Sequence, residues 1–178
     1  MKNSEKMLSA IEAQDLVQAE QWFEKALLED SDSILLDLAE YLESIGFFLQ
    51  AKRIYNKLAP LYPQVNLNLA AIASEDGDLE EAFGYLEEVR SNDPWYVNAL
   101  LIKADLYQME GLPDVAREKL VEASQLSDDP IITFGMAEID FELGNFTQAI
   151  KEYASLDNRT IYEQTGISTY QRIGVSYA

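Results

Sequence analysis

Hydrophobic residues recur every three or four positions along most of this chain, which is the spacing that one buried face of an α-helix requires. Four segments follow the same course, in which a first helical stretch reaches a glycine and a second helical stretch resumes directly after it. These segments are AEYLESIGFFLQAKRIY, AAIASEDGDLEEAFGYL, ADLYQMEGLPDVAREKL and AEIDFELGNFTQAIKEY. The pattern predicts an all-α fold built from helix–turn–helix units.

The four units share further markers in the same register. Their glycines, Gly46, Gly77, Gly111 and Gly144, lie 31, 34 and 33 residues apart. Glycine can adopt the left-handed conformation that ends a helix, and alanines let two helices approach closely. An alanine stands seven residues before each glycine, another stands five residues after it, and a bulky apolar residue follows four positions later. The three sets are Ala39, Ala70, Ala104 and Ala137, then Ala51, Ala82, Ala116 and Ala149, and finally Tyr55, Leu86, Leu120 and Tyr153.

A further unit occupies the N-terminus. Asp15 and Phe23 fit the second-helix pattern there, but Gln14 replaces the glycine. A divergent first unit of this kind is typical of the cap of a repeat array. Asp15, Asp78 and Asn145 are expected to cap the second helices of their units, because such side chains accept hydrogen bonds from free amides at a helix start.

Repeat units of this length, with their markers in this register, resemble those of the tetratricopeptide repeat (TPR) family. The 34-residue unit of that family has a W-x2-L-G-x2-Y first helix followed by A-x3-F and Pro. YQRIGVSYA, from Tyr170 to Ala178, fits the first half of this signature, and FEKALLEDS, IYNKLAPLYP and LEEVRSNDP fit the second half. The resemblance implies a right-handed α-α superhelix, a TPR solenoid, of about five helix–turn–helix repeats plus one extra C-terminal helix. We expect a single solenoid over residues 1–178, with repeats at approximately 2–31, 32–63, 64–96, 97–129 and 130–160 and the first helix of a sixth repeat at 167–178.

Some positions depart from the family pattern. Lys103 and Asp140 stand where apolar or aromatic residues are usual, which indicates either a tolerated surface position or a rotated helix. Residues 157–166 lie between the fifth repeat and the last helix, and we expect a longer turn there. The last helix has no partner helix, so its apolar face of Ile167, Tyr170, Ile173 and Tyr177 would stay uncovered. We therefore interpret the chain as an N-terminal fragment of a longer repeat array, with a homodimer through the C-terminal helix as the alternative.

Composition excludes several functional classes. The chain of 178 residues has no cysteine and no histidine, which removes thiolate nucleophiles, sulfur-ligated metals and every His-dependent triad. It contains no phosphate loop and no nucleophile motif, and no paired carboxylates lie in a sequence context that would bury them and shift their pKa values. We expect no catalytic residues, no metal and no cofactor, and thus no enzyme activity.

Charge and hydropathy limit the partners further. The formal charge of −19, from 32 acidic and 13 basic residues, would repel phosphate backbones and anionic lipids, so we expect neither nucleic acid nor membrane as a partner. No apolar stretch approaches the length of a membrane span, and the N-terminus has no signal-peptide pattern. The predicted location is the cytoplasm.

The TPR resemblance implies a concave groove, lined by the first helices, that binds extended or helical peptides. The family's carboxylate clamp of Lys and Asn side chains has no match here, because Leu36, Glu40, Leu67, Asn68 and Ala71 hold the corresponding places. An acidic groove of this kind favours partner segments that carry Lys or Arg together with apolar anchors, although acidic surface residues also serve solubility alone. The expected groove residues are Leu36, Glu40, Glu43, Leu67, Asn68, Glu75, Asn98, Leu101, Asp105, Gln108, Phe134, Glu138 and Glu142.

Together these features predict a protein–protein interaction scaffold that binds a partner protein or peptide of basic and apolar character in an acidic groove. Two alternatives stay open. The chain could be a self-associating structural module, or it could be the docking arm of a larger enzyme or regulator that continues beyond the C-terminus. Transcription regulators with such repeats carry a basic DNA-binding domain, which nothing near Met1 resembles.

Overall fold

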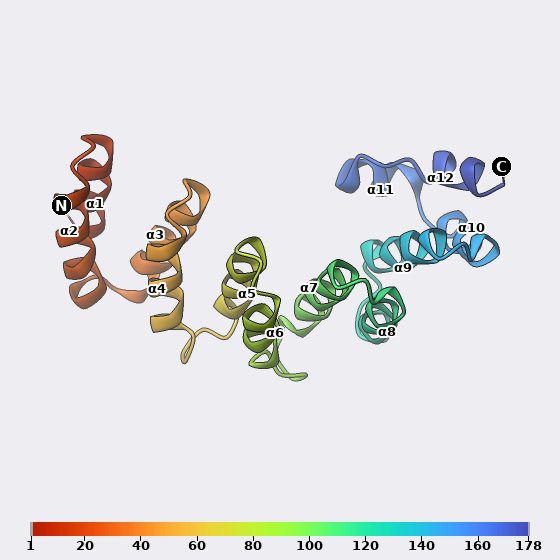
Figure 1. Ribbon diagram of the computed structural model, residues 1–178, viewed down its shortest axis with the longest axis horizontal. Coiled ribbons are helices and arrows are strands. Elements are labelled where there is room, and N and C mark those ends of the chain that lie inside the picture. Colours follow the sequence, from red (N-terminus) through yellow and green to blue (C-terminus); the bar gives the residue numbers. More distant parts are fainter. Residues whose placement is uncertain (1, 178) are drawn as a thin grey trace. The chain divides into compact units, whose positions relative to one another are not determined.

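The computed structural model describes residues 2–177, and every regular element in that part of the chain is an α-helix (Figure 1). This confirms the predicted all-α fold. Two short helices, α11 (Asn158–Thr165) and α12 (Thr169–Ser176), end the described chain. The ten helices before them form five consecutive pairs whose members contact each other: α1 (Asn3–Glu12) with α2 (Leu16–Glu29), α3 (Asp32–Ser44) with α4 (Phe48–Leu58), α5 (Val65–Glu75) with α6 (Leu79–Glu87), α7 (Tyr96–Met109) with α8 (Pro113–Ser124), and α9 (Pro130–Glu142) with α10 (Phe146–Ala154).

The chain divides into two compact units, Met1–Glu88 and Val89–Ala178. The first unit contains α1 to α6, and the second contains α7 to α12. Neighbouring pairs also pack against each other inside each unit. In the first unit α1 contacts α3 and α4 contacts α5, and in the second unit α8 contacts α9 and α10 contacts α12.

The repeated small residues lie in the core of both units. The eight alanines that mark the repeats are at most 1% exposed, and the four bulky residues that follow them are at most 4% exposed. Because alanine presents a single methyl group, the two helices of a pair can pack closely around it, and the neighbouring tyrosine or leucine fills the remaining space. The packing role that the sequence predicts for these markers is confirmed.

The four repeat glycines end the first helices as predicted. Their φ angles lie between 74° and 82°, in the left-handed region that only glycine adopts without a steric penalty. At Gly77 the amide of Asp78 then donates to the carbonyl oxygen of Ala73 at 2.9 Å, which satisfies one of the free carbonyls at the end of α5. In the N-terminal unit Gln14 takes the same conformation, with φ of 59°, so a side chain stands where the other units have glycine.

Gln14→Gly is therefore expected to stabilise the protein by roughly 0.5–1 kcal/mol, because it removes the Cβ strain of the left-handed conformation at a small cost in unfolded-chain entropy. Urea unfolding followed by circular dichroism measures the change. The matched control is Gln21→Gly, an exposed position inside α2, which should destabilise by about 1 kcal/mol. A lower unfolding midpoint for Gln14→Gly would contradict the interpretation.

Helix caps follow the sequence at two of the three predicted positions. The carboxylates of Asp15 and Asp78 each accept a hydrogen bond of 2.9 Å from the main-chain amide three residues ahead. The prediction for Asn145 is wrong, since no side chain caps α10. Its Nδ2 instead donates to Oδ1 of Asp140 at 3.1 Å, because that buried carboxylate needs donors.

The long turn predicted over residues 157–166 is also wrong, because this segment contains α11. Asp157 caps the helix start, where its Oδ2 accepts a hydrogen bond from the Thr160 amide at 2.9 Å, and Gly166 ends the helix with φ of 73°. Ile161 is fully buried in the core cluster of the second unit. A cap at each end and one buried side chain are enough to make these residues helical.

The last helix, α12, lies where the first helix of a sixth repeat is predicted. Its apolar face is divided between core and solvent. Ile167, just before the helix, and Ile173 pack against the core cluster of the second unit, whereas Tyr170 and Tyr177 are 73% and 75% exposed. Self-association through this helix stays a prediction.

Candidate partner-binding site

All thirteen predicted groove residues lie on the first helices of their pairs, because the TPR pattern assigns them to that side of each unit. Most are exposed or half-buried, and Phe134 is the exception at 7% exposed. In the first unit, α3 carries Leu36, Glu40 and Glu43, and α5 carries Leu67, Asn68 and Glu75. In the second unit, α7 carries Asn98, Leu101, Asp105 and Gln108, and α9 carries Phe134, Glu138 and Glu142.

The second unit contains a pocket of about 340 Å³ that brings five of these predicted residues together. They are Leu101, Asp105 and Gln108 of α7 with Phe134 and Glu138 of α9. Apolar side chains and oxygen-bearing side chains therefore meet in one concave site, which is the usual composition of a binding pocket.

Three further residues complete the pocket and are not among the predicted groove residues: Leu120 of α8 and Ile131 and Gly135 of α9. A Cβ atom at Gly135 would lie 3.0 Å from Cδ1 of Leu120, so the main chain of α9 lies directly against the leucine side chain. A lone glycine inside a helical pattern is the sequence signal that could have indicated this close approach.

The two carboxylates of the pocket differ in their surroundings. Glu138 is held on both sides, because Oε1 accepts a hydrogen bond from the Tyr153 hydroxyl at 2.5 Å and Oε2 accepts one from Nη2 of Arg172 at 2.7 Å. Asp105 has no hydrogen-bond or ion-pair partner among residues 2–177. Burial beside the apolar walls raises the pKa of Asp105, although the residue as a whole still reaches solvent.

Buried tyrosines of the second helices orient two of the predicted groove glutamates. The Tyr55 hydroxyl donates to Oε2 of Glu43 at 2.7 Å, as the Tyr153 hydroxyl does to Glu138. Burial raises the pKa of both tyrosines, so their hydroxyls stay protonated and act as donors. The sequence pattern indicates only a packing role for these tyrosines, because nothing local shows which carboxylate a hydroxyl will reach.

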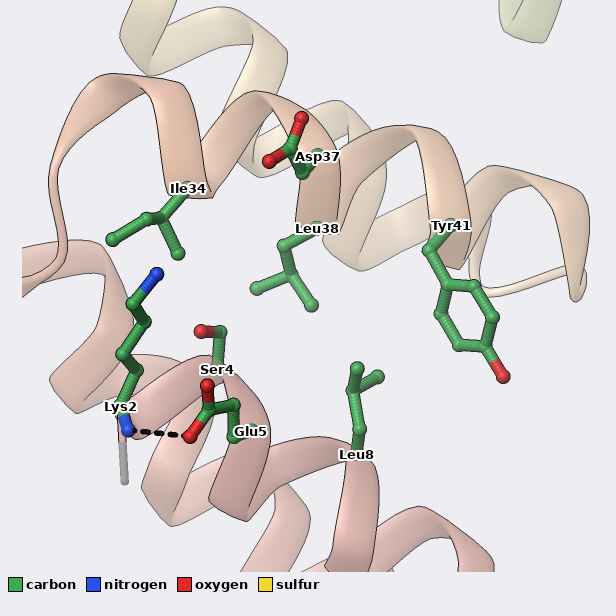
Figure 2. A pocket seen from close by; sticks show the side chains of 8 residues that line it. All are labelled: Lys2, Ser4, Glu5, Leu8, Ile34, Asp37, Leu38 and Tyr41. Atoms are coloured by element: carbon green, nitrogen blue, oxygen red, sulfur yellow. Dashed lines mark hydrogen bonds between the residues drawn. The ribbon is translucent and has the colours of Figure 1, made fainter.

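A second pocket, of about 280 Å³, lies between α1 and α3 in the first unit (Figure 2). None of its residues is among the predicted groove residues. Ile34, Leu38 and Tyr41 follow the spacing of one helix face, which is the signal that could have indicated them. Figure 2 shows these side chains and Leu8 around the opening, with Lys2 and Glu5 at one end. The remaining lining residues are Ser4 and Asp37.

The expectation that no carboxylate pair is buried is wrong. The side chains of Asp140 and Glu152 are only 4% and 10% exposed, and both contact Arg117. Nη2 of Arg117 lies 2.7 Å from Oδ2 of Asp140 and 2.9 Å from Oε1 of Glu152. Burial raises the pKa of Glu152, because its charged form is poorly solvated there.

This ion cluster explains one of the two departures from the family pattern. Asp140 is neither a tolerated surface position nor the result of a rotated helix, since it accepts hydrogen bonds from Arg117 of α8 and Asn145 at the start of α10. The two pockets above do not include it, and its contacts connect the fourth and fifth helix pairs. Lys103, the other departure, is also buried, at 8% exposed.

Neither a cluster of metal ligands nor a membrane-spanning helix is found in the described part of the chain. Over residues 2–177, no three Asp or Glu side chains are arranged to hold a metal ion. Within the same range, no helix has the length and apolar character needed to cross a bilayer.

Five helix pairs, four of them with glycine turns and alanine contacts at a period near 34 residues, define a tetratricopeptide repeat protein, and the chain belongs to this family. Residues 108–161 match the family described as YpiA-like tetratricopeptide repeats. The TPR repeat-containing protein YpiA of Bacillus subtilis (strain 168) is 31% identical over 160 residues, which cover 86% of this chain and 36% of YpiA. The chain thus spans little more than a third of the length of this curated relative.

Solved structures agree on the fold. TTC0263, a TPR protein of Thermus thermophilus, superposes with a TM-score of 0.61 at 22% identity and covers 98% of this chain and 97% of its own. MamA superposes with a TM-score of 0.63 at 22% identity and covers 82% of this chain and 80% of its own. YrrB, a TPR protein with an unusual peptide-binding site, superposes with a TM-score of 0.60 at 18% identity and covers 87% of this chain and 81% of its own. These similarities establish a TPR solenoid, which is in general a scaffold for protein–protein interactions.

Proposed function

We propose that this protein binds a partner protein or peptide of basic and apolar character on the acidic faces of its first helices. The observation that carries the proposal is the pocket of the second unit, where five residues expected to line a groove meet in one concavity. Apolar walls supply burial energy, and carboxylates at the rim select against acidic partners.

Charge supports the same choice of partner. The thirteen predicted residues include six carboxylates and no lysine or arginine, in a chain with a formal charge of −19. Such a surface attracts cationic segments and speeds their association at low salt. The contact between Arg172 and Glu138 shows that a guanidinium fits a carboxylate of this face.

A set of matched peptides tests the proposal. A fluorescein-labelled peptide of alternating lysine and leucine is compared with one in which glutamate replaces lysine and one in which serine replaces leucine. We expect the lysine–leucine peptide to bind more tightly than both others, as measured by fluorescence anisotropy. Its affinity should fall when ionic strength rises from about 0.01 M to about 0.15 M, because the screening length falls from about 30 Å to about 8 Å.

Two results would count against the proposal. One is equal binding of the lysine and glutamate peptides, and the other is an affinity of the lysine–leucine peptide that salt does not change. Either result would leave the acidic residues as solubilising surface. Circular dichroism at each salt concentration serves as the control that the protein stays folded.

The other interpretations stay predictions. Self-association is favoured by the exposed Tyr170, Val175 and Tyr177 near the end of the described chain. A docking role for a larger enzyme or regulator, the N-terminal fragment of a longer array and a cytoplasmic location rest on the sequence alone.

A further inference from the structure

The pocket between α7, α8 and α9 combines an apolar interior with one unmatched charge. Leu101, Leu120 and Phe134 supply apolar surface. Both carboxylate oxygens of Glu138 are already engaged by Tyr153 and Arg172, as described above. Asp105 is therefore the pocket carboxylate without a hydrogen-bond or ion-pair partner in the described chain. Burial beside the apolar wall raises its pKa, although the residue is exposed.

We propose that this pocket is the anchor site for one lysine or arginine side chain of the partner. Its aliphatic stem would lie against Leu101 and Phe134, and its cationic group would bind the carboxylate of Asp105. This inference rests on the proposed function, because it names the side chain by which a basic and apolar partner is held.

Lysine and arginine fit this pocket better than the other residue types. Both join an apolar stem of several methylene groups to a cationic head, and both commonly bury the stem while the head stays polar. A purely apolar side chain would cover Asp105 without supplying a partner for its charge, which is unfavourable. An acidic side chain would add a second negative charge. A metal ion would need several ligands, and the described residues provide no cluster of three.

The volume and the shape of the pocket agree with a single side chain. About 340 Å³ is at the small end of the range for ligand pockets. Gly135 lies in the interior of α9, where glycine is less favourable than alanine. A Cβ there would lie 3.0 Å from Cδ1 of Leu120, so any side chain at this position would press on the pocket wall. The glycine thus keeps the wall in its observed position.

The experiment uses the full chain and the lysine–leucine peptide of the binding test. Each lysine is replaced in turn by norleucine, which keeps most of the stem and removes the charge. Every peptide is measured against the wild type, Asp105→Asn and Glu118→Gln. Glu118 is exposed on α8, outside the predicted groove residues, and does not line the pocket, so its variant controls for the loss of one negative charge.

We expect Asp105→Asn to weaken binding of the lysine peptide about tenfold, as the loss of a charge-assisted hydrogen bond does, and Glu118→Gln to weaken it less than about twofold. One norleucine replacement should weaken binding of the peptide to the wild type by a similar factor. The same replacement should not weaken binding to Asp105→Asn any further, because both changes remove the same contact. Thermal unfolding of each variant checks that the fold is retained.

The outcomes separate the two proposals. If the lysine–leucine peptide binds in preference to its glutamate counterpart but Asp105→Asn behaves like Glu118→Gln, the anchor site is overturned and the proposed function stands. An equal loss of affinity for the wild type at every norleucine position would also overturn the anchor. General charge attraction would then explain binding, whatever the result for Asp105→Asn. If no preference for the lysine peptide exists, the proposed function fails and the anchor fails with it.

Discussion

Arg117→Ala is expected to lower the free energy of unfolding by about 3–5 kcal/mol, the largest loss we predict for a single side chain. Arg117 lies within 2.7 Å of Asp140 and 2.9 Å of Glu152, whose side chains are 4% and 10% exposed. Removing the guanidinium leaves two buried negative charges close together without a cation. Such charges are poorly solvated and repel each other, which favours the unfolded chain.

The loss should depend on pH, with a sign that follows from the same contacts. Burial already raises the pKa of Glu152, and removal of the Arg117 guanidinium, which lowers that pKa, raises it further in the folded state. The folded variant then binds protons more tightly than the unfolded chain between the unfolded and folded pKa values. Its stability therefore increases as pH falls through that window, and the difference from the wild type should be smaller at pH 5 than at pH 7.

Urea unfolding of both proteins at the two pH values measures this effect. The matched control is Arg159→Ala, since Arg159 forms an ion pair of 2.9 Å with Glu163 but is 85% exposed. We expect that variant to lose only roughly 0.3–0.5 kcal/mol. Adding Asp140→Asn and Glu152→Gln to Arg117→Ala should recover part of the loss, because neutral amides do not repel each other. Similar losses for Arg117→Ala and Arg159→Ala would contradict the importance of burial.

Ala82→Leu is expected to lower the free energy of unfolding by about 1–3 kcal/mol through overpacking, which is the second large effect we predict. Ala82 is fully buried on α6, which packs against α5, and interiors at crystal-like density have no space for three more carbon atoms. Ala154→Leu is the control, because Ala154 ends α10 at an exposed position and should change stability by no more than about 0.5 kcal/mol. Urea unfolding of both variants gives the comparison. If Ala82→Leu left the free energy of unfolding unchanged, the two helices would be able to move apart without a loss of stability.

Several features of the fold could be predicted because their causes are local. A glycine in the left-handed conformation, as at Gly46, terminates a helix through contacts within a few residues. Alanines such as Ala82 mark the contact between two helices that a short turn already places side by side. The segment of α11 was missed although it has local signals, namely Asp157 as a cap and Gly166 as a terminator, because the TPR period left no place for another helix.

The site was predictable only in part. The repeat register places Leu101, Asp105 and Phe134 on adjacent first helices, and all three line the pocket of the second unit, since equivalent positions of adjacent first helices lie close together. It did not select the pocket between α1 and α3, whose lining residues lie on other positions of those helices. It also placed Asp140 wrongly, because the donors that make its burial tolerable come from the preceding helix pair and from the turn that follows α9.

By itself the sequence determined the order, spacing and pairing of the helices, because periodic apolar residues, glycine terminators and small contact residues act over short distances along the chain. Only the tertiary structure decided what each acidic residue does. Asp105 and Glu138 each follow a repeat alanine and look equivalent in the sequence. Arg172, 34 residues beyond Glu138, neutralises one of them, whereas no side chain of the described chain reaches the other. A charge is matched by whatever packing brings within a few ångströms, and the linear order of residues does not encode that distance.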